Sequence, residues 1–247
     1  MNTKPVLSIL ITLLLTSASL LSACAPSAAS APSDPLTIVQ LYYDALQAKD
    51  LDKAMTYAAD NVIASDATGY YYGKEEVTAA IKRGWAAGDV IEESDFKAAG
   101  NRVTSCYKYY QNETLVDQNC NAVTHVRDGK IIFDGLQPNE SLFVVQEFYE
   151  ALNAKDVDTA MTWVAPDALF ANPTGKFEGQ DAIRASLESQ ARDGITFELS
   201  KFHMIGTRVS YDYKVMSGSE QLESGTNGLT IVKDGKVVFD GTQETAP

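Results

Sequence analysis

The segment VQLYYDALQAKDLDKAMTYAAD at residues 39–60 recurs as VQEFYEALNAKDVDTAMTWVAP at residues 145–166. The repeat extends outward from this segment without a gap: residues 39–135 align with 145–241 at a constant offset of 106, and 35 of the 97 aligned positions are identical. A period of about a hundred residues is the size of a domain, so the duplication predicts two tandem domains rather than a solenoid. We place these domains at 36–138 and 139–247.

Each copy opens with helical patterns. Apolar residues recur at helical spacing at Ile38, Val39, Tyr42 and Leu46 in the first copy. A second short helix is expected to follow, with Asp50 in the first copy and Asp156 in the second as its N-caps. A third helix is expected at 74–85 and at 180–191.

The rest of each copy reads as strand. Residues 102–110 and 115–126 are rich in Thr, Tyr and Val and predict a long hairpin, and an Asp-Gly pair at 128–129 or 234–235 predicts a tight turn into the last strand. Helices followed by a meander predict an α+β fold: two tandem domains, each with about three N-terminal helices packed on a curved antiparallel sheet.

The N-terminus has the pattern of an export signal. Lys4 precedes an apolar run from Val6 to Leu15, which is too short to span a membrane. The run leads to Leu21-Ser22-Ala23-Cys24, which resembles the lipobox of bacterial lipoproteins. We therefore expect a signal peptide at 1–23, lipid on Cys24, and a flexible Ala-, Ser- and Pro-rich linker to residue 35. The alternative is an ordinary secretory signal cleaved after Ala23, with Cys24 incidental.

Charge excludes one class of partner. The chain carries 33 acidic and 20 basic residues, a net charge of -13, and has no block of Lys and Arg. Nucleic acid binding needs clustered basic residues, so we expect no nucleic acid partner.

Each copy resembles a nuclear transport factor 2-like domain of the SnoaL-like kind, the cone-shaped fold shared with ketosteroid isomerase. The resemblance rests on YYDALQAKDLDKAM and FYEALNAKDVDTAM, on LFANPTGKFEGQDAIRASL at 169–187, and on the Asp-Gly-Lys turn near the end of each copy. It implies the fold more firmly than the function, because similar domains include cyclases, isomerases, dehydratases and non-catalytic binding modules.

With Cys24 lipidated, Cys106 and Cys120 remain, and both lie in the predicted hairpin of the first copy. If the turn is centred on Glu113, residues whose numbers sum to 226 face each other, and 106 and 120 do so. Directly opposed Cβ atoms lie about 4.5–5.5 Å apart, so we expect a disulfide in an oxidising compartment. No His or Cys cluster supplies further ligands, so we expect no metal site.

By resemblance to ketosteroid isomerase, Tyr42 and Asp66 of the first copy stand where that enzyme has its oxyanion tyrosine and its carboxylate base. Proton transfer beside a carbonyl needs such a base and such an O–H donor. The second acid of that enzyme is missing, because this chain has Asn121 near the expected position. The alternative is that Tyr42 is a core aromatic residue and Asp66 forms a turn.

The second copy lacks both groups, since Phe148 replaces Tyr42 and Asn172 replaces Asp66. Polar and aromatic residues at other positions could line a ligand cavity, although such residues are also common in cores. These candidate ligand-binding residues are Trp85, Tyr107, Asn121, His125, Phe148, Trp163, Asn172, His203 and Tyr211.

No phosphate-binding loop, dinucleotide fingerprint or nucleophile elbow occurs, so we expect no cofactor. These patterns favour an exported protein anchored to the bacterial cell envelope by lipid on Cys24, which binds a small hydrophobic ligand or an envelope protein without catalysis. We expect the two domains to pack as a pseudo-dimer. The alternative is a SnoaL-like isomerase, cyclase or dehydratase that acts on a small carbonyl compound through the first domain.

Overall fold

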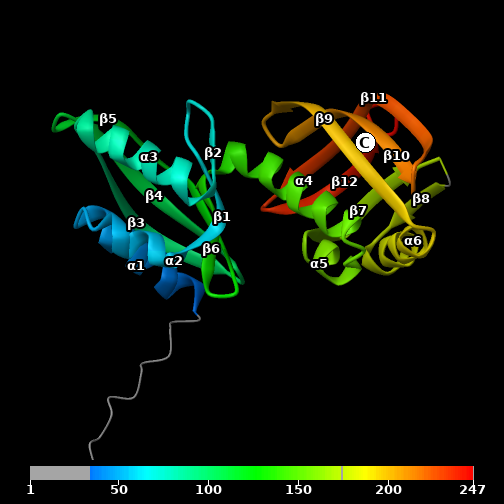
Figure 1. Ribbon diagram of the computed structural model, residues 1–247, viewed down its shortest axis with the longest axis horizontal. Coiled ribbons are helices and arrows are strands. Elements are labelled where there is room, and N and C mark those ends of the chain that lie inside the picture. The colour runs from blue at the N-terminus through cyan, green and yellow to red at the C-terminus, as the bar shows by residue number, and fades with distance from the viewer. Residues whose placement is uncertain (1–33, 174, 247) are drawn as a thin grey trace, which may run out of the picture. The chain divides into compact units, whose positions relative to one another are not determined.

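Both repeats build three helices and six strands in the same chain order. The computed structural model describes residues 34–173 and 175–246, and Figure 1 follows the chain through both repeats. The first repeat contains α1 (Pro35–Gln47), α2 (Leu51–Tyr57), β1 (Ala58–Ser65), β2 (Tyr70–Tyr72), α3 (Gly73–Ala86), β3 (Asp89–Ala99), β4 (Arg102–Gln111), β5 (Thr114–Arg127) and β6 (Lys130–Leu136). The second contains α4 (Gln137–Asn153), α5 (Val157–Thr162), β7 (Val164–Asn172), β8 (Gly175–Glu178), α6 (Gln180–Arg192), β9 (Ile195–Ile205), β10 (Arg208–Ser217), β11 (Glu220–Lys233) and β12 (Lys236–Thr242).

The two sheets have equivalent strand orders, β2-β1-β6-β5-β4-β3 and β8-β7-β12-β11-β10-β9. The α+β class and the tandem organisation are confirmed. The expectation of a wholly antiparallel sheet is wrong at one pair in each repeat, because β1 pairs in parallel with β6 and β7 with β12. The chain leaves β1, forms α3 and the β3–β5 meander, and returns to β1 in the same direction as it left.

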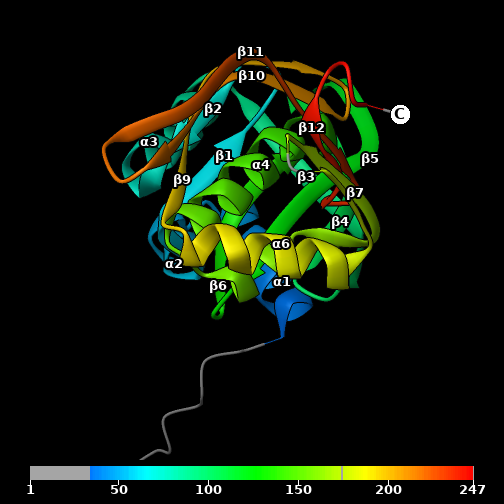
Figure 2. The same ribbon diagram turned by 90° about the vertical axis from the view of Figure 1, so that its right-hand side faces the viewer.

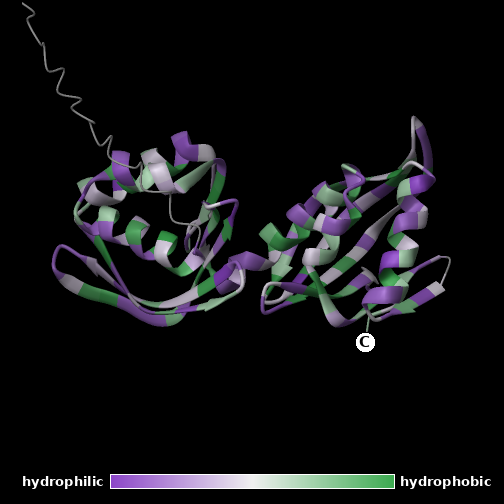
Figure 3. Ribbon diagram, turned by 90° about the horizontal axis from the view of Figure 1, so that it is seen from below, coloured by the Kyte–Doolittle hydropathy of each residue, from purple (hydrophilic) through white to green (hydrophobic). Residues whose placement is uncertain are grey.

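The helices of each repeat lie on the concave side of its sheet. Figure 3 shows this for the first repeat, and Figure 2 shows α4 inside the curve of β9, β10 and β11. Ile38 and Val39 of α1 and Phe143 and Val144 of α4 are fully buried. Burial of these helical faces is the main stabilising contribution that joins helix to sheet.

The helix caps follow the sequence pattern. Asp50 accepts a hydrogen bond from the Lys53 amide at 3.0 Å, and Asp156 accepts one from the Thr159 amide at 2.9 Å. Each carboxylate satisfies an amide that has no partner within the first turn of its helix, so both predicted N-caps are confirmed.

The lysine of each Asp-Gly-Lys turn forms a hydrogen bond between the last strand and the second helix of its repeat. Asp128 has a positive φ of 51° and Gly129 one of 73°, the geometry expected of this turn. The Lys130 ammonium donates to the carbonyl of Thr56, and Lys236 donates to that of Thr162 in the same way. This contact explains a structural role for the lysine in both copies.

The predicted disulfide between Cys106 and Cys120 is present. Tyr107 pairs with Asn119 and Tyr109 with Asp117, so the expected sum of 226 holds on one side of the bond. The register then shifts by one at Tyr110, which pairs with Leu115, and the tip of the hairpin is Asn112–Glu113.

The signal peptide, Cys24 and most of the linker lie outside the described residues. Among the residues that the structure describes, no helix is long and apolar enough to cross a membrane.

Candidate functional site

The structure places the two predicted catalytic residues in different surroundings. Asp66 lies in the exposed turn between β1 and β2, where it accepts hydrogen bonds from the Thr68 amide at 2.7 Å and the Tyr71 hydroxyl at 3.0 Å. Partial burial raises the pKa of Asp66, but the hydrogen bonds from Thr68, Tyr71 and Gly69 outweigh it and lower the pKa below the ordinary value. A carboxylate with these partners is a weak base and stabilises the turn.

Tyr42 instead faces a different carboxylate. Its side chain is 2% exposed in α1, and burial raises its pKa, with further contributions from the charge of Asp134 and a hydrogen bond to it. The role of Tyr42 and Asp66 as a catalytic pair therefore remains a prediction, while the interior carboxylate nearest Tyr42 comes from β6.

Asp134 is the centre of an interior polar cluster in the first repeat. The Tyr43 hydroxyl of α1 donates to Asp134 Oδ1 at 2.5 Å, and the Thr124 hydroxyl of β5 donates to the same oxygen at 3.0 Å. Burial raises the pKa of Asp134, although the hydrogen bonds from Tyr43, Thr124 and Tyr42 act in the opposite direction.

Glu93 adds a second carboxyl to this cluster from the edge strand β3. Burial, the largest cause, and the nearby charge of Asp134 raise the pKa of Glu93 to about 8, against the opposing effect of hydrogen bonds from Ser105 and Tyr43. The Oε2 atom of Glu93 is buried and has no hydrogen-bond partner. At neutral pH the cluster therefore contains a carboxylic acid with unused hydrogen-bonding capacity.

The second repeat has the same central carboxyl, Asp240, but different side chains around it. The Tyr149, Tyr211 and Thr230 hydroxyls donate to Asp240 Oδ1 at 3.0, 3.1 and 2.5 Å. Burial raises the pKa of Asp240 to about 6, while these three hydrogen bonds act against the rise. Tyr211 occupies the position of Ser105, and Leu199 that of Glu93.

The two repeats also differ at the end where the helix-linking loop approaches the edge strand. In the second repeat, the Asn153 side chain donates to the Phe197 carbonyl at 2.8 Å and accepts from the Phe197 amide at 2.7 Å. The Lys155 ammonium donates to the Ile195 carbonyl beside this clamp. These contacts join α4 and its following loop to the edge strand β9.

The corresponding end of the first repeat is open. A groove of about 520 Å³ is lined there by Lys49, Gly88, Asp89, Val90, Glu92, Tyr110, Asn112 and Glu113. Lys49 is the counterpart of Lys155, and Asp89 that of Ile195. Ile91, which replaces Phe197, is 51% exposed, whereas Phe197 packs against Tyr149 with ring centroids 5.2 Å apart.

The SnoaL-like domain matches residues 39–133 and 145–239, most of the described chain. The chain belongs to the SnoaL-like family. The resemblance inferred from the repeated segments is thereby confirmed, in two tandem copies. No curated protein matches the chain.

Solved structures resemble single repeats of this SnoaL-like protein. A nuclear transport factor 2-like protein of unknown function from Cytophaga hutchinsonii is 21% identical with a TM-score of 0.36, over 40% of this chain and 85% of its own. An epoxide hydrolase of the LEH-like type from M. tuberculosis is 19% identical with a TM-score of 0.36, over 42% and 80%. A putative ketosteroid isomerase from Kribbella flavida is 14% identical with a TM-score of 0.37, over 45% and 84%.

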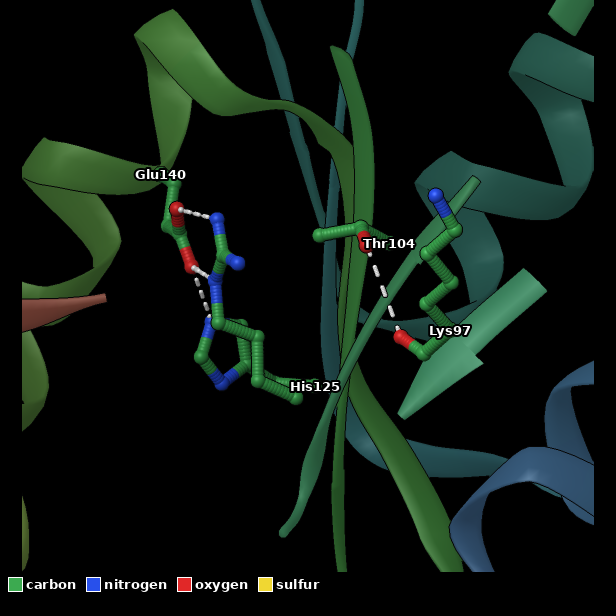
Figure 4. Close-up of polar contacts among 5 residues, drawn as sticks. Lys97, Thr104, His125 and Glu140 are labelled. Carbon is green, nitrogen blue, oxygen red and sulfur yellow. Dashed lines mark hydrogen bonds and ion pairs between the residues drawn. The ribbon is translucent and has the colours of Figure 1, made fainter. Parts of the chain in front are cut away.

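His125 belongs to a second buried site, at the start of α4 (Figure 4). Its Nε2 lies 2.5 Å from Glu140 Oε1, and Arg102 binds both Glu140 oxygens at 2.6 and 2.9 Å. Burial raises the pKa of Glu140, but its bonds to Arg102 and His125 lower it by more, below the usual range. The His125 ring also lies 5.5 Å from the Trp163 ring, so the structure brings these two predicted ligand residues together.

The other predicted ligand residues do not form one site. Phe148 is fully buried in the second core, and Tyr211 belongs to the Asp240 network. Trp85 is half-buried in α3, and Asn172 and His203 are exposed. The Tyr107 hydroxyl donates to Asp117 at 2.6 Å. The Oδ1 atom of Asn121 is buried and has no hydrogen-bond partner.

Sequence reasoning missed Tyr43, Glu93 and Asp134. A usable signal was present for two of them, because Tyr43 and Asp134 are unchanged at Tyr149 and Asp240. Glu93 had no such signal, because its counterpart is Leu199. Only the folded chain places Glu93 of β3 near Asp134 of β6. Within the described residues, no group of three or more His, Cys, Asp or Glu side chains is placed to hold a metal ion.

Proposed function

We propose that this SnoaL-like protein is an exported, lipid-anchored binding protein whose first repeat takes up a small, largely apolar molecule without catalysis. The observation that carries the proposal is the open end of the first repeat, at the positions where the second repeat is closed by Asn153 and Lys155. The groove has the volume of a small-molecule site, which is about 300–1,000 Å³.

The other face of β3, opposite the Val90 and Glu92 side chains that line the groove, also offers surface for a ligand. Side chains alternate across a strand, so Ile91 and Glu93 share the face of β3 that looks toward α1. Ile91 is half exposed, whereas the larger Phe197 fills the equivalent position. A ligand that covered Ile91 would lie on the same face of β3 as Glu93.

The second repeat has the features of a closed support. Its network around Asp240 is satisfied by three hydroxyls, and Phe148, Phe170 and Tyr149 pack as neighbouring rings. We propose that it stabilises the first repeat as the other half of a pseudo-dimer. An envelope protein partner remains a further prediction.

The anchor is proposed from the lipobox-like Leu21-Ser22-Ala23-Cys24 alone. Lipid on a cysteine at the mature N-terminus would hold a protein at a membrane without a spanning helix. Replacing Cys24 by Ala should move the protein from the membrane fraction to the soluble fraction and remove the lipid mass from its N-terminal peptide. An unchanged distribution would contradict the anchor.

The ligand is best sought by native mass spectrometry of the full chain, purified in mild detergent. We expect a co-purified small molecule that is lost from Ile91→Phe, because this change installs the side chain that fills the second repeat. The matched control, Phe197→Ile, should keep the ligand. A protein that carries nothing, or a ligand that survives Ile91→Phe, would count against the proposal.

A second candidate is a SnoaL-like isomerase, cyclase or dehydratase acting on a small carbonyl compound. It is favoured by the meeting of Tyr42, Glu93 and Asp134 in one interior, since an acid whose pKa is raised to about 8 can donate a proton at neutral pH. The test is exchange of α-hydrogens of a ketone such as cyclohexenone in D2O, followed by NMR. Exchange that Glu93→Gln abolishes would establish this candidate, and exchange equal to buffer alone would remove it.

A further inference from the structure

Strand β3 is an edge strand of the first sheet, and the second repeat shows which of its backbone groups point away from the sheet. Ile91 corresponds to Phe197, and both residues have the same register against the neighbouring strand. The Phe197 amide and carbonyl bond to the Asn153 side chain, so they point outward. The amide and carbonyl of Ile91 therefore also point outward, and those of Glu93 do so because the direction alternates along a strand.

This outer edge is unclamped in the first repeat. Gln47 and Lys49 stand at the positions of Asn153 and Lys155. Among the described residues, neither side chain bonds to β3, and the outward amide and carbonyl of Ile91 have no partner in the chain. Unpaired backbone groups of an edge strand are a template for the addition of another strand.

The open part of the edge is short. It begins at Asp89 and ends where the register against β4 shifts between Ser94 and Lys97. Asp95 has a positive φ of 53° at this irregularity. Because a bulge bends its strand, an added strand can pair only with residues 89–94.

Two exposed apolar side chains of this stretch lie between two acids. Val90 is 43% exposed and Ile91 51%, and the acids beside them are Asp89 and Glu92. A side chain of an added strand lies on the same face as the residue opposite it, with the Cβ atoms about 4.5–5.5 Å apart. The complementary segment therefore has two apolar side chains opposite Val90 and Ile91, flanked by basic ones opposite Asp89 and Glu92.

The charge of this edge decides which kind of segment can add to it. The groove beside β3 contains the carboxylates of Asp89, Glu92 and Glu113 and a single basic residue, Lys49. Pairing two copies of β3 with each other would bring like charges together, which is unfavourable. An acidic surface attracts a segment of the opposite charge. A basic segment of another protein therefore fits this edge better than a second copy of this chain.

We propose that β3 binds an extended, basic segment of a partner protein, which adds to the first sheet as an antiparallel strand along residues 89–94. This inference goes beyond the proposed uptake of a small molecule, because the occupant is a protein and the backbone of Ile91 takes part in its recognition. The second repeat does not bind in this way, because the Asn153 side chain already occupies the outward groups of Phe197.

The test uses the full chain in mild detergent and the peptide acetyl-TTKIVK-amide, whose isoleucine stands opposite Ile91 when the strands are antiparallel. Near saturation, hydrogen exchange of the Ile91 amide should slow by at least about tenfold, while the Phe197 amide is unchanged. The same peptide methylated on the amide nitrogen of its isoleucine keeps its charge but cannot donate to the Ile91 carbonyl. It should bind at least about tenfold more weakly.

The contribution of charge is tested by an exchange of residues. Glu92→Lys should weaken binding of the peptide at least about fivefold, and replacing the first lysine of the peptide with glutamate should restore binding to this variant. The matched control is Glu198→Lys, at the corresponding position of the second repeat, which should leave binding unchanged. Glu92 and Glu198 are both exposed, so neither change disturbs a core.

An Ile91 amide that the peptide does not protect would overturn the inference and leave the proposed function intact, because the co-purified small molecule is measured separately by native mass spectrometry. Equal binding of the methylated and unmethylated peptides would also overturn it, since binding would then depend on charge alone. A protein that carries no small molecule but shows protection of Ile91 by the peptide would reject the proposed function and support the inference.

Discussion

The interiors of the two repeats are built on the same three residues and finished differently. Tyr43, Thr124 and Asp134 have unchanged counterparts in Tyr149, Thr230 and Asp240, and in both repeats the hydroxyls donate to the carboxyl. The neighbours of this shared centre are Glu93, Ser105 and Ile91 in the first repeat and Leu199, Tyr211 and Phe197 in the second. The shared centre serves the fold, and the changed neighbours indicate where a function specific to one repeat lies.

A second contrast concerns charge: Glu140 is buried with two basic partners, whereas Asp134 and Asp240 are buried with hydroxyls alone. We predict the largest loss of stability from Glu140→Ala, because it leaves Arg102 and His125 buried without a carboxylate. Removing one partner of a buried ion pair costs about 3–5 kcal/mol. Urea denaturation followed by circular dichroism measures the loss.

The matched control is Glu188→Ala, which removes an exposed carboxylate of α6 that lies 4.0 Å from Arg184. Exposed pairs contribute about 0–1 kcal/mol, so this variant should be nearly as stable as the unmodified protein. Similar losses from both variants would show that burial does not distinguish the Glu140 cluster.

Asp240→Asn should remove a pH dependence of stability. Burial raises the pKa of Asp240 to about 6 in the folded state, from 3.8 for the free side chain. The folded protein therefore holds a proton that the unfolded chain has lost between about pH 4 and pH 6, and its stability falls as the pH rises through this window. A shift of two units corresponds to about 3 kcal/mol.

The measurement is the difference in unfolding free energy between the unmodified protein and Asp240→Asn at each whole pH unit from pH 4 to pH 9. This difference should decline with rising pH and become constant above pH 6. Glu93→Gln provides the comparison in the first repeat, where the decline should continue to about pH 8 because burial raises the pKa of Glu93 to about that value. Differences that are flat with pH would contradict the assignment of both protonated acids.

A third contrast concerns interior volume, because Ser105 of the first repeat corresponds to the larger Tyr211 of the second. Exchange of residues between the repeats tests this contrast. Ser105→Tyr should copy the filling of the second repeat, but Tyr211 fits there beside Gly228, where an added Cβ would clash with its ring. The first repeat has Ala122 at that position. The single variant should therefore lose about 1–3 kcal/mol through overpacking, and Ser105→Tyr with Ala122→Gly should recover most of it.

Both variants should also lose ligand from the first repeat, because the tyrosine occupies space beside Glu93. Thermal unfolding of the single variants and the double variant completes the cycle. Additive effects of the two changes would show that Gly228 is not the partner that admits Tyr211.

The repeated segments predicted most of this fold. Asp50 and Asp156 were identified as caps because a cap acts on amides three residues away, and Cys106 and Cys120 were paired because the distance across a hairpin follows from the residue count. The parallel pair β1–β6 could not be obtained in this way. It joins strands far apart in the chain, and no local pattern determines such a pairing.

The candidate site was harder to predict for the same reason. Asp66 was placed beside Tyr42 by counting along the chain, yet its carboxylate is used by its own turn, and the carboxyl facing Tyr42 comes from β6. Glu93 reads as one of several acids along an exposed edge strand. Its hydrogen-bond partners, Ser105 and Tyr43, come from other elements.

The smallest predicted effect concerns the clamp on the edge strand. An edge strand leaves backbone amides and carbonyls unpaired, and Asn153 satisfies both groups of Phe197. Asn153→Ala should cost about 1 kcal/mol, since its hydrogen bonds are exposed to water. The sharper measurement is hydrogen exchange, in which the Phe197 amide should lose protection while the Ile91 amide is unchanged.

The reverse change, Gln47→Asn, places the shorter amide of Asn153 at the open end of the first repeat. If the clamp is what separates the two repeats, this variant should protect the Ile91 amide and weaken ligand binding. Protection of the Ile91 amide without a change in ligand binding would mean that binding does not depend on this end of β3. The difference in interior side chains alone would then distinguish the two repeats.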